Sequence, residues 1–210
     1  TKRLQALRYW REHQSLSRID LVRRFAAAPE GTFASPLHHL GQRDYLARGL
    51  GARDRLRCVL SHYRFEDATF DAAYQDAVYG GRGIALWRHD GEAGDFALVL
   101  AASAGDDAEG DLTISLQVDG VLLHRLSWSW VEGALFGVDL PILPFLTGNQ
   151  GRWNESGPAF DTFEAAFPNN SPSFFCFAAL QGLVQTLGID RVLAVRASAH
   201  VACDPARGEA

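Results

Sequence analysis

Two histidines and one glutamate are the residues of this chain best suited to move a proton. His62 stands in a Ser61-His62-Tyr63 run inside a helical stretch, His200 follows a short apolar strand, and Glu109 follows an acidic loop. A histidine with an ordinary pKa of about 6.5 can take a proton from an attacking amine, while Glu109 can orient a histidine or hold the amine. Each also has a structural alternative: a histidine that satisfies a local hydrogen bond, or a solvated loop carboxylate.

Aromatic side chains could supply an apolar pocket beside these groups. Alternation along residues 121–131 places Trp128 and Trp130 on one face of a predicted strand, because successive side chains of a strand point to opposite sides. With Phe145, the two indoles are suited to line an acyl pocket, or to fill the core as strand aromatics more often do. The substrate-binding candidates are Tyr63, Trp128, Trp130 and Gln150.

A short glycine-containing run offers a site for the donor of an acyl group. It reads Gly148-Asn149-Gln150-Gly151, with Arg152 beside it. Glycine-rich loops bring backbone amides to phosphates at helix N-termini, and this run matches such loops only loosely. An ordinary polar turn is the alternative. The cofactor-binding candidates are Gly148, Gly151 and Arg152.

No metal site is predicted. His38 and His39 are adjacent, so on a helix they point in different directions and do not chelate together easily. The sequence has neither an HExxH run nor paired CxxC motifs, which are the usual zinc signatures.

Apolar spacing and turn residues predict the elements that must position these groups. Helices are expected over residues 2–13, 18–28, 35–50, 54–65 and 67–78, and strands over residues 84–88, 96–102, 111–118 and 121–131. Asp119-Gly120 predicts a tight hairpin. An extended apolar run over 135–146, a polar loop over 148–158 and a short helix over 160–167 follow. The end of the chain is predicted to form a buried helix over 174–187, stopped by Gly188, and a strand over 191–195.

This order of elements indicates an α+β fold. We expect N-terminal helices packed on a mostly antiparallel twisted sheet, with one long C-terminal helix covering it. The order is similar to that of the acetyltransferase-like fold, in which a pantetheine thioester enters where two strands splay. The chain is expected to form a single domain over residues 1–210, with residues 1–50 as a candidate helical extension.

Composition and charge narrow the class of protein. With 210 residues and 47% hydrophobic side chains, the chain can bury a sizeable core. Its three cysteines form no close pair, which favours a reducing cytoplasm, and no apolar run approaches the roughly 20 residues that span a bilayer. Residues 1–64 carry 13 basic against 5 acidic side chains, and the remainder 7 against 20. The basic part could bind anionic lipid or an acidic carrier, or it could pack on the acidic part of the same chain. Nucleic acid is not an expected partner, because aromatic residues do not alternate with the basic ones as they do on nucleic-acid-binding surfaces.

Four segments, in this order, resemble the VirK/YbjX family of bacterial proteins: Leu60–Phe65, Glu109–Leu116, Leu122–Trp130 and Leu180–Val201. Gly148, Gln150 and Gly151 echo a glycine-glutamine-glycine turn of that family. The resemblance covers residues 55–201 and makes 51–201 a VirK-like core. It implies an association with virulence, envelope remodelling and antimicrobial peptide resistance, but it names no reaction.

The chain departs from the family pattern in three places. Phe163–Phe175 has no lysine or arginine where the family is basic, residues 196–199 lack the usual asparagine, and residues 201–210 do not match the basic tail that the family is expected to carry after the last histidine. If those features serve the family's function, this member is altered or specialised.

Two functions from different classes follow. The first is an acyltransferase-like enzyme that moves an acyl group from a thioester carrier, acyl-CoA or acyl carrier protein, to an amine of a peptide or lipid, with no tightly bound cofactor. The second is a non-catalytic envelope or virulence accessory protein that binds a partner or lipid, with peripheral membrane contact. If the protein is an enzyme, we expect His62, His200 and Glu109 to lie around one cleft beside the strand that carries Trp128 and Trp130. The accessory protein predicts that they lie apart.

Overall fold

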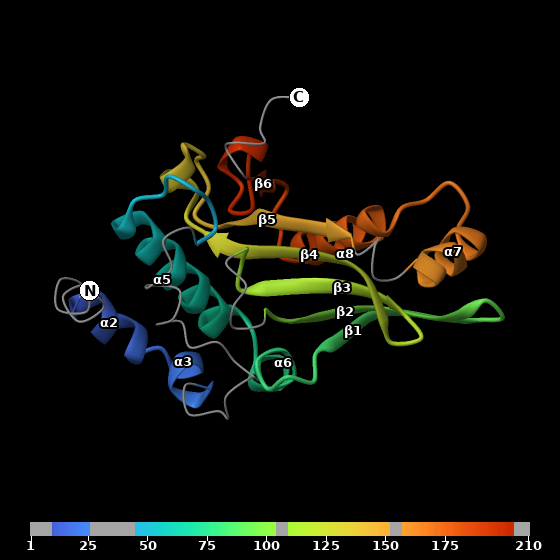
Figure 1. Cartoon of the computed structure of the whole chain (residues 1–210). Helices are drawn as coiled ribbons and strands as arrows, with labels where there is room; N and C mark the ends of the chain where they lie inside the picture. The colour runs from blue at the N-terminus through green and yellow to red at the C-terminus, as the bar shows by residue number, and fades with distance from the viewer. Residues whose placement is uncertain (1–9, 26–44, 104–108, 152–156, 204–210) are drawn as a thin grey trace.

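A six-stranded sheet forms the centre of the computed structural model, which describes residues 10–25, 45–103, 109–151 and 157–203 (Figure 1). The strand order follows the chain, and the first five strands pair antiparallel, whereas β6 joins β5 in parallel. The strands are β1 (Ile84–Gly91), β2 (Gly94–Ala102), β3 (Leu112–Val118), β4 (Val121–Val131), β5 (Leu143–Gly151) and β6 (Leu193–Ala194). The expected α+β class and mostly antiparallel sheet are therefore confirmed.

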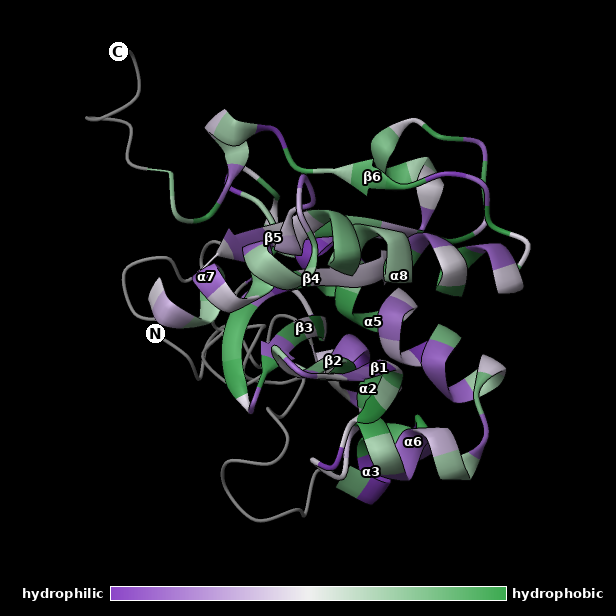
Figure 2. Ribbon diagram, turned by 90° about the vertical axis from the view of Figure 1, so that its right-hand side faces the viewer, coloured by the Kyte–Doolittle hydropathy of each residue, from purple (hydrophilic) through white to green (hydrophobic). Residues whose placement is uncertain are grey.

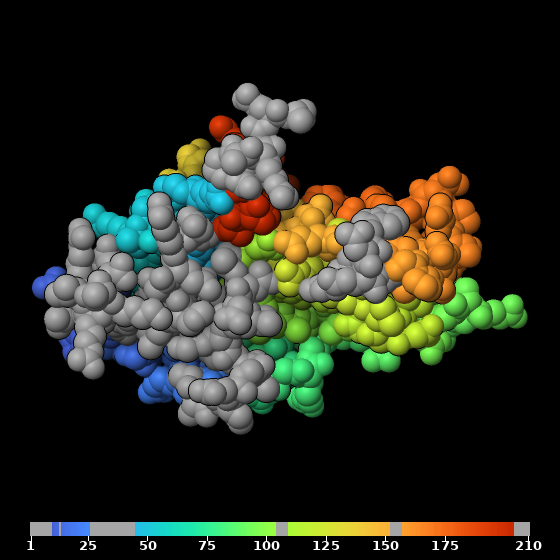
Figure 3. Space-filling model, in the orientation of Figure 1, coloured from blue at the N-terminus to red at the C-terminus, as the bar shows by residue number. Residues whose placement is uncertain are grey.

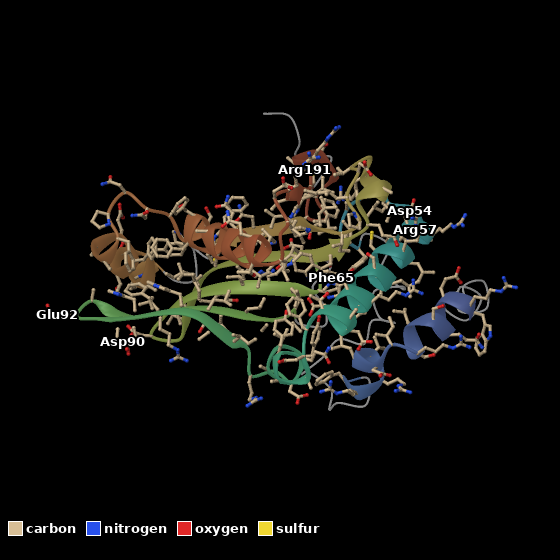
Figure 4. The ribbon with its side chains drawn as sticks, turned by 180° about the vertical axis from the view of Figure 1, so that it is seen from behind. Asp54, Arg57, Phe65, Asp90, Glu92 and Arg191 are labelled. Carbon is tan, nitrogen blue, oxygen red and sulfur yellow. The ribbon has the colours of Figure 1, made fainter. Side chains whose placement is uncertain are left out.

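Helices pack on this sheet mainly through α5 and α8. The described helices are α2 (Trp10–Ser17), α3 (Asp20–Phe25), α5 (Ala52–Thr69), α6 (Ala72–Val78), α7 (Gly157–Ala166) and α8 (Pro172–Thr186), with short 3-10 turns at Gly133–Phe136 and Ala197–Ala199. α8 lies across β2 to β5, behind the strands in Figure 1 and in front of them in Figure 4. α5 packs on β4, and α2 and α3 pack on α5. α2 and α3 therefore form an outer layer on α5 instead of packing mainly on the sheet as expected.

Local sequence signals account for the hairpin between β3 and β4. Asp119 and Gly120 have φ of 51° and 78°, the left-handed pair that a two-residue turn of this hand requires. Along β3, alternate side chains are fully buried while Thr113, Ser115 and Gln117 stay half-buried, which confirms the expected alternation. The buried members are Leu112, Ile114, Leu116 and Val118.

Capping explains the bounds of α8. The Ser171 side chain accepts a hydrogen bond from the Phe174 amide at 3.2 Å, Pro172 follows at the first helical position, and Gly188 with φ of 70° follows the end. Cys176, Leu180 and Val184, four residues apart, are buried in the core. Other apolar residues of the helix, Phe174, Ala178 and Leu183, line an open groove, and much of the α8 ribbon is pale to green in Figure 2.

Three expectations for other segments differ from the structure. Residues 148–151, expected in a polar loop, form the end of β5, because they pair with His124–Ser127 of β4. Residues 45–50, expected in a helix, form turns. The predicted final strand shrinks to Leu193–Ala194, since only these two residues reach β5. Arg152 and residues 26–44 lie outside the described residues.

Candidate functional site

Glu109 is held in the fold by two glycines. Gly110 has φ of 145°, and a Cβ on it would lie 2.7 Å from the Trp128 carbonyl oxygen. Only glycine therefore allows the backbone at residue 110 to approach the backbone of β4 this closely. A Cβ on Gly148 would lie 2.5 Å from Oε2 of Glu109, so the missing side chain leaves the space that the carboxylate fills. The Glu109 side chain is only 6% exposed.

His200 faces this carboxylate from the other end of the chain. Its Nε2 lies 3.5 Å from Oε1 of Glu109, and its side chain is 23% exposed. Its Nδ1 accepts a hydrogen bond from the exposed Ala202 amide at 3.1 Å. In the neutral ring the proton is therefore on Nε2, facing Glu109. A carboxylate that faces a half-buried imidazole is one arrangement in which a histidine can act as a general base.

Gln150 and Arg125 complete the polar group. The Gln150 amide nitrogen donates to Oε1 of Glu109, and its amide oxygen accepts from Nη2 of Arg125 at 2.9 Å. These two bonds set the orientation of the amide, because only one of its ends can donate. The predicted residues Glu109, His200, Gln150 and Gly148 thus come together at the β5 edge of the sheet.

A ladder of hydroxyl groups lies on the strands next to this group and was not predicted. Thr113 Oγ1 lies 2.7 Å from Oγ of Ser103 and 2.8 Å from Oγ of Ser127, and the Ser127 Cβ would lie 3.1 Å from a Cβ on Gly148. The alternation of Thr113 and Ser127 with apolar residues was visible in the sequence, but their alignment depends on the register of β2, β3 and β4.

A pocket of about 400 Å³ adjoins His200 through its neighbour Ala199. Its walls come from three separate parts of the chain: residues 47–50, Phe136 with Phe145, and residues 193–196 with Ala199. The Arg48 amide donates to the Ala199 carbonyl at 2.8 Å, which holds the first and last parts together. Figure 3 shows these two parts, light blue and red, side by side.

His62 lies in the core instead of in this pocket. It is fully buried, its Nδ1 accepts the Trp130 amide hydrogen at 3.2 Å, and its Nε2 lies 3.2 Å from the Tyr79 hydroxyl. Its partners Trp130 and Tyr79 do not belong to the group around Glu109. This environment matches the structural alternative for His62.

A buried glutamate on the same helix was missed by the sequence analysis. Glu66 is fully buried and accepts a hydrogen bond from the Trp130 indole at 2.6 Å. Burial raises the pKa of Glu66 to about 8, against the opposing effect of the hydrogen bond from the Trp130 indole. Helix spacing alone gives no sign of this, because Glu66 stands among polar residues in the sequence.

Asp111 is a second buried carboxylate, and Tyr63 belongs to it. The Asp111 carboxylate accepts hydrogen bonds from three hydroxyl groups: that of Tyr45, that of Tyr63 at 3.0 Å and that of Ser129 at 2.5 Å. Burial, and then the charge of Asp111, raises the pKa of both phenols well above the usual value. The Tyr63 hydroxyl therefore ties α5 to the start of β3.

Both tryptophans of β4 are fully buried, and neither lines the pocket beside His200. Trp130 packs its ring 4.8 Å from that of Phe65, which Figure 4 labels on α5. The Trp128 indole nitrogen has no hydrogen-bond partner among the described residues. Of the predicted pocket aromatics, Phe145 alone lines it.

The described residues form neither a metal site nor a membrane-spanning helix. No three His, Cys, Asp or Glu side chains lie close enough to hold a metal ion, and no described helix is long and apolar enough to cross a membrane.

Comparison with known proteins places the chain in a family. No curated protein and no solved structure matches it. One family model, described as a protein of unknown function (DUF535), matches residues 23–137, which is more than half of the chain and includes His62, Glu109 and both tryptophans of β4. This is the VirK/YbjX family that the four segments resemble, although the match stops before Gln150 and His200. The chain is a member of the DUF535 family of proteins of unknown function.

Proposed function

We propose that the protein is an acyltransferase-like enzyme that moves an acyl group from a thioester carrier to an amine. The observation that carries the proposal is the His200–Glu109 pair, at 3.5 Å, next to a pocket that reaches Ala199, has mostly apolar walls and is large enough for part of a ligand. Gly148 and Gln150 support the pair from β5, and Arg125 supports Gln150.

The position of this pair in the sheet favours the proposal. β5 and β6 pair in parallel at Phe145–Leu193 and Leu146–Ala194. β5 then continues to Gly151 alongside β4, whereas β6 ends and the chain turns through Ala197–Ala199 to His200. The two strands therefore separate just where Glu109 and His200 meet. A splay between parallel strands is where acetyltransferase-like folds admit a pantetheine thioester, so the sheet offers the corresponding place.

The chemistry assigns one role to each side chain. The amine nitrogen attacks the thioester carbonyl carbon, and its proton passes to Nδ1 of His200 once the incoming amine displaces the Ala202 amide from that atom. Glu109 accepts a hydrogen bond from the Nε2–H group of His200 and stabilises the imidazolium that forms. The carbon–sulfur bond then breaks, and the leaving thiolate takes the proton from His200. In this scheme His62 and Tyr63 stabilise the fold and do not touch the substrate.

Acyl transfer by matched histidine variants tests the proposal. Wild-type protein is incubated with acyl-CoA or acyl carrier protein thioesters of several chain lengths and a set of peptide and lipid amines, and products are read by mass spectrometry. His200→Ala should lower the rate by about 10²–10⁴-fold, the usual contribution of a general base. His89→Ala, an exposed change on β1, should not. A His200→Ala protein with the wild-type rate would refute the assignment.

A non-catalytic lipid-binding role is the second candidate, and a different feature favours it. An apolar groove of about 680 Å³ runs between α8 and the β1–β2 hairpin, with Phe174 at 58% exposure and no charged side chain in its walls. A Cβ on Gly182 would meet nothing within 4 Å, so a larger side chain there fills the groove. Binding of a fluorescent fatty acid that Gly182→Phe abolishes, in a protein without transferase activity, would favour this role. Equal binding by both proteins would count against it.

A further inference from the structure

The pocket beside His200 carries two arginines in otherwise apolar walls. Arg48 is half-buried and Arg196 is exposed, and both line it together with Leu50, Phe136, Phe145 and Val195. Neither guanidinium has a hydrogen-bond or ion-pair partner among the described residues. By contrast, Arg24 pairs with Asp76 and Arg57 pairs with Glu132.

These two charges stand out against their surroundings. Residues 65–210 carry 20 acidic and only 7 basic side chains, and Arg196 is one of the seven. Two like charges around one pocket repel each other, and binding an anion between them relieves that repulsion. Arginine is also the side chain whose planar donors match phosphate and carboxylate oxygens.

We infer that this pocket binds an anionic group joined to an apolar stem, with Arg48 and Arg196 as its anion-binding residues. The arginines hold a phosphate or carboxylate, and the aromatic and aliphatic walls take the stem. The inference rests on the proposed function, since the ligand it describes is the donor whose acyl carbon reaches His200. The carboxylate of a free fatty acid has this chemistry along its whole chain, and the phosphate of a phosphopantetheine arm has it at the dimethyl-substituted carbon next to the phosphate, before the hydroxyl and amides of the arm.

Backbone contacts hold the turn that carries Arg48. Leu46 and Gly49 have φ of 63° and 82°, so the turn that carries Arg48 has a defined shape. Nη1 of Arg55 donates to the Leu50 carbonyl at 2.5 Å, and the Arg48 amide donates to Ala199. The turn is thus joined to α5 on one side and to the segment before His200 on the other.

Calorimetric titration with three probes tests the inference without any need for transfer activity. The probes are coenzyme A, pantetheine, which is the arm of coenzyme A without its phosphates and nucleoside, and decanoate; 4′-phosphopantetheine, which adds only the phosphate to pantetheine, should bind as coenzyme A does. Wild-type protein should bind coenzyme A at least about 10-fold more tightly than pantetheine, and added salt should weaken the binding. In the double variant Arg48→Gln/Arg196→Gln, the affinity for coenzyme A should fall about 10- to 100-fold, to the level of pantetheine.

A charge-matched variant is the control. Arg64→Gln/Arg88→Gln removes two exposed arginines from other parts of the surface and should bind coenzyme A like the wild type. Thermal unfolding confirms that both double variants are folded. Decanoate binding that is lost in Arg48→Gln/Arg196→Gln would support the same site with a carboxylate as its anion.

Three results would overturn the inference: no binding of either anion, equal binding of coenzyme A and pantetheine, or unchanged affinities in the Arg48→Gln/Arg196→Gln protein. The outcomes also separate the two proposals. Transfer with an unchanged KM in that variant refutes the anion site and leaves the enzyme. Anion binding that needs the two arginines, in a protein that transfers no acyl group, refutes the enzyme and leaves the site.

Discussion

Replacing His62 by alanine tests whether this histidine holds the fold together or performs chemistry. The side chain is fully buried and joins the Trp130 amide on β4 to the Tyr79 hydroxyl at the end of α6. Removing it leaves a cavity and an unpaired buried amide. A large-to-small core change costs about 2–5 kcal/mol, and an unpaired buried group about 1–3 kcal/mol. Because these effects overlap, we expect the free energy of unfolding to fall by about 3–5 kcal/mol.

Urea and thermal unfolding measure this loss. For a domain of this size each kcal/mol lowers Tm by about 2–4 °C, so the expected shift is roughly 10 °C. His62→Asn is the matched variant, since its side-chain oxygen can still accept the Trp130 amide; it should recover about 1–2 kcal/mol of the loss. His200→Ala, at the partly exposed site, should shift Tm by less than about 3 °C.

The reasoning fails if His62→Ala unfolds at the wild-type temperature. A normal Tm together with lost acyl transfer would return His62 to the role of general base. A lowered Tm with transfer retained at a temperature where the variant is folded would settle its role as structural.

Three more expectations follow from the buried groups and the glycine beside Glu109. Burial raises the pKa of Glu66 to about 8 from an ordinary value of 4.5, so the folded state holds this proton more tightly than the unfolded state. The stabilisation that the protonated Glu66 gives the folded state is therefore complete below about pH 4.5. It is lost, by a few kcal/mol, as pH rises toward 8. When the free energy of unfolding in urea is measured over this pH range, Glu66→Gln should make it depend less on pH. Leu180→Ala should cost about 2–5 kcal/mol, whereas Leu183→Ala, in the groove wall, should cost clearly less in the same unfolding assay; equal losses would contradict the packing of α8. Gly148→Ala brings a methyl group into the Glu109 carboxylate, so it should abolish transfer while Gly157→Ala, at the exposed start of α7 where a Cβ meets nothing within 4 Å, should not, as a side-by-side rate measurement would show.

Local patterns in the sequence predicted the parts of the fold that depend on neighbouring residues. Alternation along β3, the Asp119-Gly120 turn and the capping of α8 by Ser171, Pro172 and Gly188 each involve residues a few positions apart. The element order then indicated the α+β class, and four ordered segments indicated the family. These patterns predicted the local structure correctly because propensity, capping and periodicity depend on residues only a few positions apart.

Long-range pairing decided what those patterns could not. Residues 148–151 have the composition of a turn, but β4 supplies hydrogen-bond partners for their backbone and makes them a strand. Leu183 has the spacing of a core residue, yet it lines an open groove, since nothing in the described chain covers that side of α8.

In the candidate site, too, local sequence patterns and long-range contacts decided different things. The sequence alone singled out Glu109, His200 and Gln150 as polar residues next to predicted strands, but it could not distinguish their roles from that of His62. Only the tertiary structure brings Glu109 to His200, 91 positions later, and places His62 between α6 and β4. The physical reason is that a side chain's burial and partners are set by whichever distant segments pack against it, and no local spacing encodes that contact.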